Sequence, residues 1–313
     1  MIVTFLILII GISALWIGGE CLVKGAQSIG YRLHLSPIFI GLTIVSFGTS
    51  APELIVNVIA SYHHQSDIVF GNIIGSNIAN ILLILGCCGI VFPLTLQINL
   101  QKEVIYHFLL IGTLTVLILV SPPQMIFNTV KAAVILVLFS IFLITLFCKN
   151  KITDQQVQFV NQSIKSAIFM LILGIILLPI GGKLIINGTT AIALSLRIPE
   201  AIVSLIAIGI GTSLPELAAS IIAATRHETD IVIGNILGSN IFNIGLILSI
   251  SGFISPLVFP MILIKNLYFL LIISLLFLVI IIIKQYRQHT QKISRLESGI
   301  LLVTYVLFLI SVI

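Results

Sequence analysis

Long apolar runs separated by short polar connectors dominate this chain of 313 residues. Most of these runs exceed the length of about 18 residues that indicates a membrane-spanning helix, whereas a barrel strand needs only about 10 residues with alternation. Only 8% of the residues are charged, and because a soluble domain carries about 25%, the chain cannot cover itself with a wettable surface. The sequence therefore predicts an all-α integral membrane protein.

The apolar runs predict ten transmembrane helices. We expect them near residues 2–24, 37–62, 68–92, 103–121, 127–148, 165–187, 199–225, 230–254, 263–284 and 298–313. The first run lacks a basic start and a small-residue cleavage site, so we expect a span rather than a cleaved signal peptide. The polar connector 149–162 predicts a linker between a first half, residues 1–148, and a second half, residues 163–313.

The two halves repeat each other. Residues 48–86 align with residues 211–249 without a gap, and 24 of the 39 aligned pairs are identical. A weaker upstream match aligns the glycines of the first run with those of the sixth: Gly11, Gly18, Gly19 and Gly25 with Gly174, Gly181, Gly182 and Gly188. Because each half holds five spans, an odd number, the second repeat is expected to enter the membrane inverted. This arrangement is typical of transporters that bind substrate near the midplane, where the repeats meet.

The basic residues predict the orientation. With the N-terminus outside, the connectors on the inner side hold 11 of the 15 Lys and Arg residues. Cytoplasmic loops carry an excess of such residues, so both termini are expected on the non-cytoplasmic side of the cell's inner (plasma) membrane. The same scatter over short loops argues against nucleic-acid binding.

A carboxylate interrupts one predicted span in each half. The segments "GTSAPELIVN" (48–57) and "GTSLPELAAS" (211–220) contain Glu53 and Glu216. An ionised carboxylate at bilayer depth costs about 2.5–3.5 kcal/mol even on lenient insertion scales. Glycine and proline also disfavour a continuous helix here and free backbone carbonyls. Hydroxyls lie one turn before each carboxylate, at Thr49 and Ser50 in the first copy and at Thr212 and Ser213 in the second.

The next helix of each half carries a polar stripe. In "GNIIGSNIAN" (71–80), residues Asn72, Ser76 and Asn80 are four apart and share one helix face. The segment "GNILGSNIFN" (234–243) repeats the stripe with Asn235, Ser239 and Asn243. Glycines at 71, 75, 234 and 238 allow close approach of neighbouring helices.

Together these segments offer only hard oxygen donors: two carboxylates, hydroxyls, amide oxygens and freed backbone carbonyls. Such donors suit Ca²⁺ and Na⁺ rather than zinc or copper. Two ionised glutamates balance one Ca²⁺, and several Na⁺ ions can occupy the same oxygens with similar neutrality. An empty site would leave two uncompensated buried carboxylates, which resists reorientation without cargo and favours obligatory exchange.

These residues resemble the sodium/calcium exchanger family of the cation/calcium antiporter superfamily, especially its short prokaryotic members. The resemblance rests on two copies of "GTS-x-PE" followed by "D-I-V-x-GN-I-x-GSNI-x-N". It implies that Glu53 and Glu216 ligate both ions, and that the first and sixth helices slide past the remainder. It assigns supporting hydroxyl and carbonyl oxygens to Thr49, Ser50, Thr212 and Ser213, and Na⁺ positions to Ser76, Asn80, Ser239 and Asn243.

One position departs from part of the family. Some relatives, including potassium-dependent exchangers, carry Asp at the position of Asn243, whereas this chain has Asn in both copies. The resemblance therefore implies potassium independence and leaves the exchange stoichiometry open.

The expected function is a secondary antiporter that moves Ca²⁺ outward in exchange for Na⁺. Two alternatives stay open: a cation/proton exchanger, in which a glutamate takes up protons, and a non-transporting scaffold whose polar stripes only join helices. The glutamates could also be ordinary helix starts after proline. Glu20 and Lys183 are expected to be interfacial or gating residues. The sequence shows no nucleophile–base pair and no phosphate-binding loop, so we do not expect an enzyme. We also expect no cofactor and no protein partner.

Overall fold

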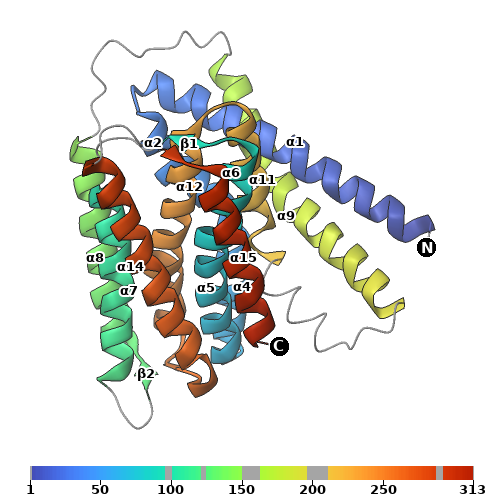
Figure 1. Ribbon diagram of the computed structural model, residues 1–313. Helices are drawn as coiled ribbons and strands as arrows, with labels where there is room; N and C mark the ends of the chain where they lie inside the picture. Colours follow the sequence, from blue (N-terminus) through green and yellow to red (C-terminus); the bar gives the residue numbers. More distant parts are fainter. Residues whose placement is uncertain are drawn as a thin grey trace.

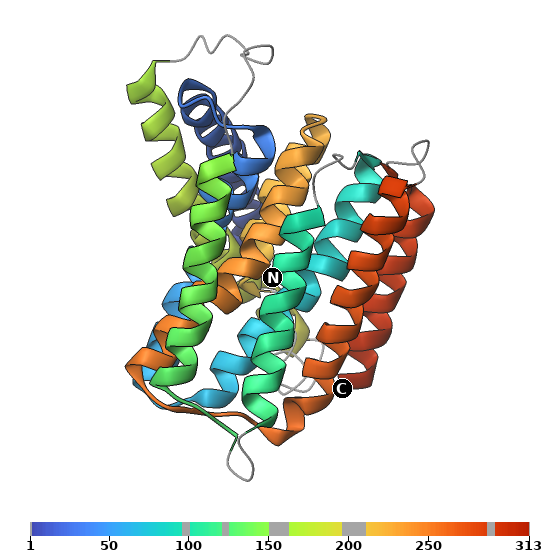
Figure 2. The ribbon, with the colours of Figure 1, turned by 90° about the vertical axis from the view of Figure 1, so that its left-hand side faces the viewer.

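The computed structural model describes residues 2–95, 101–120, 125–149, 163–195, 211–286 and 292–312. Within these ranges the chain forms a helix bundle, from which two long helices, α1 and α9, extend to one side (Figure 1). The first half contains α1 (Ile2–Arg32), α2 (Pro37–Ile40), η1 (Gly41–Val45), α3 (Ser46–Thr49), α4 (Ala51–Tyr62), α5 (Ser66–Ala79), η2 (Asn80–Ile84), α6 (Leu85–Val91), α7 (Gln101–Leu119) and α8 (Thr129–Lys149). The second half contains α9 (Ile164–Ser195), α11 (Leu214–Thr225), α12 (Thr229–Phe242), η4 (Asn243–Ile247), α13 (Leu248–Ile254), η5 (Met261–Leu263), α14 (Ile264–Tyr286) and α15 (Arg295–Val312). Figure 2 shows the bundle from the side on which α7, α8 and α14 lie.

Two short antiparallel strand pairs join loops of the first half to loops of the second. Strand β1 (Leu94–Thr95) pairs with β4 (Lys292–Ile293), and β2 (Ile126–Phe127) pairs with β3 (Leu257–Val258). Strands β1 and β2 lie at opposite ends of the bundle (Figure 1). The two halves are therefore tied together at both ends of the molecule.

Seven described helices are long and apolar enough to cross a membrane, and a bent pair, Pro37–Thr49 with Ala51–Tyr62, makes up to eight. The chain is thus a multi-pass membrane protein, but the predicted count of ten is not confirmed. Residues 196–210, which begin the predicted span 199–225, lie outside the described ranges, and so does most of the predicted linker, from 150 to 162. The predicted tenth span corresponds to α15, which is not among the seven.

The predicted span 37–62 is broken in its middle. The axis bends by 48° between Thr49 and Ala51, and Ser50 has φ −83° and ψ 7°, outside the helical region. Pro52 falls in the first turn of α4, where its missing N–H costs nothing and its fixed φ suits the helix. The break that proline and glycine predict is therefore present, and it places a helix N-terminus inside the bundle.

Helices α1 and α9 pack closely on each other through the glycines that the repeat aligns. A Cβ added at Gly18 would lie 3.0 Å from Leu177 Cβ, and one at Gly174 would lie 2.8 Å from the Gly18 carbonyl oxygen. Gly11, earlier in α1, meets Ile185, later in α9, so the helices run antiparallel, as inverted repeats require. Their 31 and 32 residues span about 47 Å at 1.5 Å per residue, which exceeds the bilayer core of about 30 Å and requires tilt.

The expected ends of these two helices, residues 24 and 187, are wrong. Helix α1 continues to Arg32 and α9 to Ser195. A charged residue such as Lys24 usually indicates the end of a membrane span. Here, however, the Lys24 ammonium pairs with Glu20 one turn earlier at 2.9 Å. An i,i+4 pair of this kind stabilises a helix, so the charge does not end it.

The halves cross where two further glycines meet. A Cβ at Gly41 would lie 2.9 Å from Gly234 Cα, and a Cβ at Gly238 would lie 2.6 Å from the Leu42 carbonyl oxygen. The close approach expected of Gly234 and Gly238 is therefore confirmed. The same expectation is wrong for Gly71 and Gly75, because no described atom beyond the glycine's own helix lies within 4 Å of an added Cβ. This crossing brings α12 of the second half against η1 and α3 of the first.

Candidate functional site

The two glutamates occupy equivalent places in the two halves. Glu53 lies in the first turn of α4 and Glu216 in the first turn of α11, each one residue after a proline. Glu53 and Glu216 are only 1% and 2% exposed, and Ser50, three residues before Glu53, hydrogen-bonds to the Glu216 carboxylate. The positive end of each helix dipole stabilises the negative charge there. Each glutamate thus lies at an ordinary helix start, but it is also buried, and a helix-start role does not require burial.

The hydroxyls before one glutamate reach across to the other half. Ser50 Oγ donates a hydrogen bond to Glu216 Oε1 at 3.0 Å. Thr49 Oγ1 donates to Asn235 Oδ1 at 3.1 Å, and the equivalent Thr212 Oγ1 donates to Asn72 Oδ1 at 2.9 Å. The last two bonds join equivalent positions of the sequence repeat, so the repetition extends to individual hydrogen bonds.

The stripes on α5 and α12 face the same interior. Asn243 Nδ2 donates to Ser76 Oγ at 3.2 Å, and the Ser239 hydroxyl lies 3.5 Å from Thr49 Oγ1. Asn80 bonds through its Nδ2 to Asn240 Oδ1 at 2.9 Å. These contacts all cross between halves.

Many oxygens of this cluster have no hydrogen-bond partner among the described residues. They include both carboxylate oxygens of Glu53, the second carboxylate oxygen of Glu216, the Ser213 hydroxyl and the amide oxygens of Asn80 and Asn243. A buried polar atom without a partner costs about 1–3 kcal/mol, and more when it is charged. Five of the ten predicted site residues thus carry buried oxygens that lack compensation within the described chain.

Both halves change to a π-helix at the last asparagine of the stripe. The segments η2 and η4 begin at Asn80 and Asn243 respectively. Such insertions are rare in proteins and frequent at functional sites. Nothing in the local sequence predicts them, because Asn-Ile followed by apolar residues suits an ordinary α-helix equally well.

Three asparagines beyond the ten predicted residues also contribute to the site. Asn72 and Asn235 accept the bonds from the two threonines, and Asn240 holds Asn80. The spacing of four residues places Asn72 and Asn235 on the same helix face as the predicted serines and asparagines, so the sequence pattern does indicate them. Asn240 carries no such signal, because it falls one residue outside the stripe.

The donor set determines which ions fit. The described residues contain no group of three or more His, Cys, Asp or Glu side chains that could hold a metal ion. The site therefore combines two carboxylates with neutral hydroxyl and amide oxygens, which is the chemistry of a hard cation such as Ca²⁺ or Na⁺ rather than of zinc.

A second charged cluster connects α1 to the bundle. Glu20 pairs with Lys24 at 2.9 Å and also with the guanidinium of Arg226, the residue that ends α11. Lys183, which occupies the matching place in α9, is exposed. Of these two positions, expected to be interfacial or gating residues, Glu20 is the one with an ion pair to the second half within the described chain.

Comparison with known proteins gives the family. The family model described as "Sodium/calcium exchanger protein" matches residues 3–148 and 166–313. This chain belongs to the sodium/calcium exchanger family.

Relatives of this exchanger match along most of their length. It is 31% identical to the sodium/calcium exchanger MaX1 of Methanosarcina acetivorans, with 98% of each chain covered. It is 34% identical to the putative antiporter CaxA of Alkalimonas amylolytica, with 82% of each chain covered. The solved structure of the sodium-calcium exchanger NCX_Mj, soaked with Na⁺ and Ca²⁺, superposes with a TM-score of 0.82 at 30% identity, covering 98% of this chain and 97% of that one. The exchanger is therefore a membrane antiporter of the cation/calcium class.

Proposed function

We propose that this exchanger is a secondary active antiporter that moves Ca²⁺ outward in exchange for Na⁺ at the site between its two halves. Glu53 and Glu216 supply the charge, and Thr49, Ser50, Ser76 and Asn80, with their counterparts in the second half, supply neutral oxygens. One observation carries the proposal: two buried carboxylates from opposite halves lie in one cluster, and three of their four oxygens lack a described hydrogen-bond partner. Both transported ions are substrates, and neither is a resident cofactor.

The charge of the cluster explains why transport would be an exchange. A Ca²⁺ ion neutralises both glutamates, and Na⁺ ions can do the same in larger number. Without ions, two negative charges would face each other away from water, where desolvation costs several kcal/mol per ion. The empty site therefore resists the change from one side of the membrane to the other.

The α1–α9 pair is the element that we propose to move. Its helices pack on each other through glycines, which present a smooth surface, and they extend to one side of the bundle (Figure 1). The crossing of η1 with α12 fixes the rest of the site by backbone contacts. Sliding of the pair would open the cluster to either side, with both chain termini on the non-cytoplasmic face. The Glu20–Arg226 contact would have to break or lengthen in the process.

We expect an imposed Na⁺ gradient, directed outward, to drive Ca²⁺ uptake into vesicles that contain the purified exchanger. Uptake should stop when an ionophore collapses the Na⁺ gradient. A pH gradient without Na⁺ should give no uptake. If the pH gradient drives uptake and the Na⁺ gradient does not, then the protein is a cation/proton exchanger.

Ca²⁺ is expected to raise the unfolding temperature of the detergent-solubilised exchanger, because a ligand that binds only the folded state stabilises it. At a Ca²⁺ concentration of about 100 times Kd the gain is about 2.7 kcal/mol. Mg²⁺ should protect less, since it loses its water shell reluctantly and demands shorter bonds. Thermal unfolding with Ca²⁺, Mg²⁺ and choline at equal ionic strength measures this. Equal unfolding temperatures in all three would support the scaffold alternative.

A further inference from the structure

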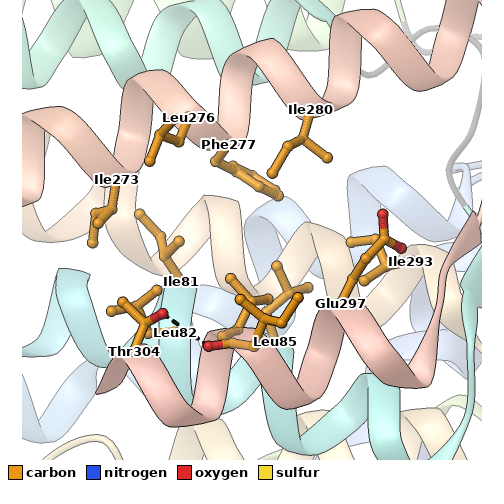
Figure 3. Close-up of a pocket in the computed structure, with 12 residues that line it drawn as sticks. Ile81, Leu82, Leu85, Ile273, Leu276, Phe277, Ile280, Ile293, Glu297 and Thr304 are labelled. Atoms are coloured by element: carbon orange, nitrogen blue, oxygen red, sulfur yellow. Dashed lines mark hydrogen bonds between the residues drawn. The ribbon is translucent and has the colours of Figure 1, made fainter. Parts of the chain in front are cut away.

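An apolar groove of about 230 Å³ runs along the bundle between α14, α15 and the η2–α6 segment, away from the ion site. Ile81, Leu82 and Leu85 form its floor, and Phe277 on α14 reaches in from one wall (Figure 3). The groove thus has walls from both halves of the chain.

The lining of the groove is suited to hydrocarbon. Apart from Glu297 and Thr304, every lining side chain is apolar. The Thr304 hydroxyl is already bonded to the Ile300 carbonyl at 2.8 Å, so it does not need a polar ligand (Figure 3). The volume of the groove is about 230 Å³. It fits a length of alkyl chain and is smaller than most pockets for drug-sized ligands.

The groove is open towards the surrounding membrane. Leu276 on α14 and Ile300 on α15 line it and are 55% and 57% exposed. A lipid tail can therefore enter from the side between these two helices, whereas Ile81 on the floor is fully covered.

One end of the groove carries an excess of positive charge. Glu297 lies at this end beside Ile293 (Figure 3), and its carboxylate is fully engaged by Lys284 at 2.7 Å and by Ser294. Lys292 and Arg295, which flank these residues, are exposed and make no ion pair within the described chain. The positive charges of Lys292 and Arg295 are therefore not neutralised by a described carboxylate, and they lie beside this end of the apolar groove.

We propose that this groove binds one phospholipid with an anionic headgroup. The acyl chain lies between α14 and α15, and the phosphate lies against Lys292 and Arg295. Each basic residue near an anionic lipid surface contributes favourably to binding. Zwitterionic lipids would fill the groove with the same chain but gain less from the two cations.

The lipid would contact the back of the ion-site helix. Leu82 and Leu85 of the groove floor follow Asn80 within the same π-helical and helical segment. A chain bound in the groove would therefore support the segment that positions Asn80, on the side opposite the cluster.

Native mass spectrometry of the delipidated exchanger, mixed with phosphatidylglycerol or phosphatidylcholine of identical chains, tests the proposal. We expect one phosphatidylglycerol to be retained at least about fivefold more strongly than phosphatidylcholine, and Lys292→Gln to weaken the retention about fivefold. The side chain of Lys292 makes no described hydrogen bond, so the substitution leaves the fold intact. Ile300→Trp, which fills the groove from its exposed rim, should abolish retention of both lipids.

The control is Val303→Trp, an equally bulky change at a residue of α15 that is 60% exposed and does not line the groove. Equal retention by the Ile300→Trp and Val303→Trp variants would overturn the groove as the binding site. Equal retention of the two lipids would overturn the role of the anionic headgroup. If glycerol phosphate alone bound as strongly as phosphatidylglycerol, the acyl chain would be excluded as the anchoring part. Because lipid retention is measured without transport, each of these failures would leave the proposed ion exchange untouched.

Discussion

Replacing Glu216 with glutamine is expected to abolish Na⁺-driven Ca²⁺ uptake and, at the same time, to raise the unfolding temperature of the ion-free protein. Glutamine has the same shape, and its amide oxygen can still accept the hydrogen bond from Ser50. The substitution removes one of two buried acidic groups, whose like charges destabilise each other when both are ionised. A site that exists to bind cations should therefore become more stable and less active when it loses a carboxylate.

The loss of activity should be large. Two unit charges 4 Å apart attract by about 4 kcal/mol at an effective dielectric constant of about 20, and a divalent ion doubles this. Even after desolvation offsets much of that energy, we expect Ca²⁺ affinity to fall by at least about 100-fold. Glu53→Gln should behave in the same way, because the two glutamates are equivalent in the repeat.

The matched control is Asp67→Asn. Asp67 also lies in the first turn of a helix, but it is exposed, so its loss should leave uptake and the Ca²⁺-dependent rise in unfolding temperature unchanged. Uptake of Ca²⁺ into vesicles and thermal unfolding with and without Ca²⁺ measure both effects. Glu216→Gln protein that transports normally, or that keeps its full Ca²⁺ protection, would contradict the proposed site.

Adding a single methyl group at Gly234 is expected to destabilise the exchanger and to disrupt its ion site. In Gly234→Ala the new Cβ would lie 2.6 Å from the Ile38 carbonyl oxygen and 2.9 Å from Gly41 Cα. Both are backbone atoms, so no side chain can rotate away. Overpacking of this kind costs about 1–3 kcal/mol. The adjacent Asn235, which accepts the bond from Thr49, must shift with the backbone, so Ca²⁺ protection should fall as well.

Gly112→Ala provides the control for this substitution. Gly112 lies inside α7, and beyond its own helix no described atom comes within 4 Å of its added Cβ. Alanine favours a helix over glycine by about 1 kcal/mol, so this variant should be as stable as the parent or more so. Thermal unfolding of both variants measures the difference. If Gly234→Ala were as stable as Gly112→Ala, the close crossing of the two halves would be wrong.

Much of the site could be predicted because its signals are local. Spacings of three and four place Thr49, Ser50 and Glu53 on one turn, and the repeat supplies a second copy of each residue. Proline after a break predicts the helix start before Glu53, and the structure has it there. Whether these residues bind ions stays a prediction, since geometry alone does not test it.

The remaining features depend on contacts between distant residues. The bond from Thr49 to Asn235 joins residues 186 apart in the chain, and the Glu20–Arg226 contact joins residues 206 apart. No local pattern encodes such pairs, because they form only when helices of the two halves pack against each other. The end of α1 was mispredicted for a different, local reason: Lys24 pairs with Glu20 one turn earlier, so its charge does not end the helix.

The sequence by itself determined that this protein lies in a lipid bilayer, that it contains an internal repeat, and that the repeat places two acids in equivalent positions. Run length, composition and spacing are sufficient for these, because the bilayer and the helix impose fixed lengths and periods. Only the tertiary structure decided how the halves cross, which amide holds which hydroxyl, where the π-helices begin and that a groove opens behind Asn80. These features depend on side chains and backbones that packing brings together from distant parts of the chain, so no single segment of the sequence predicts them.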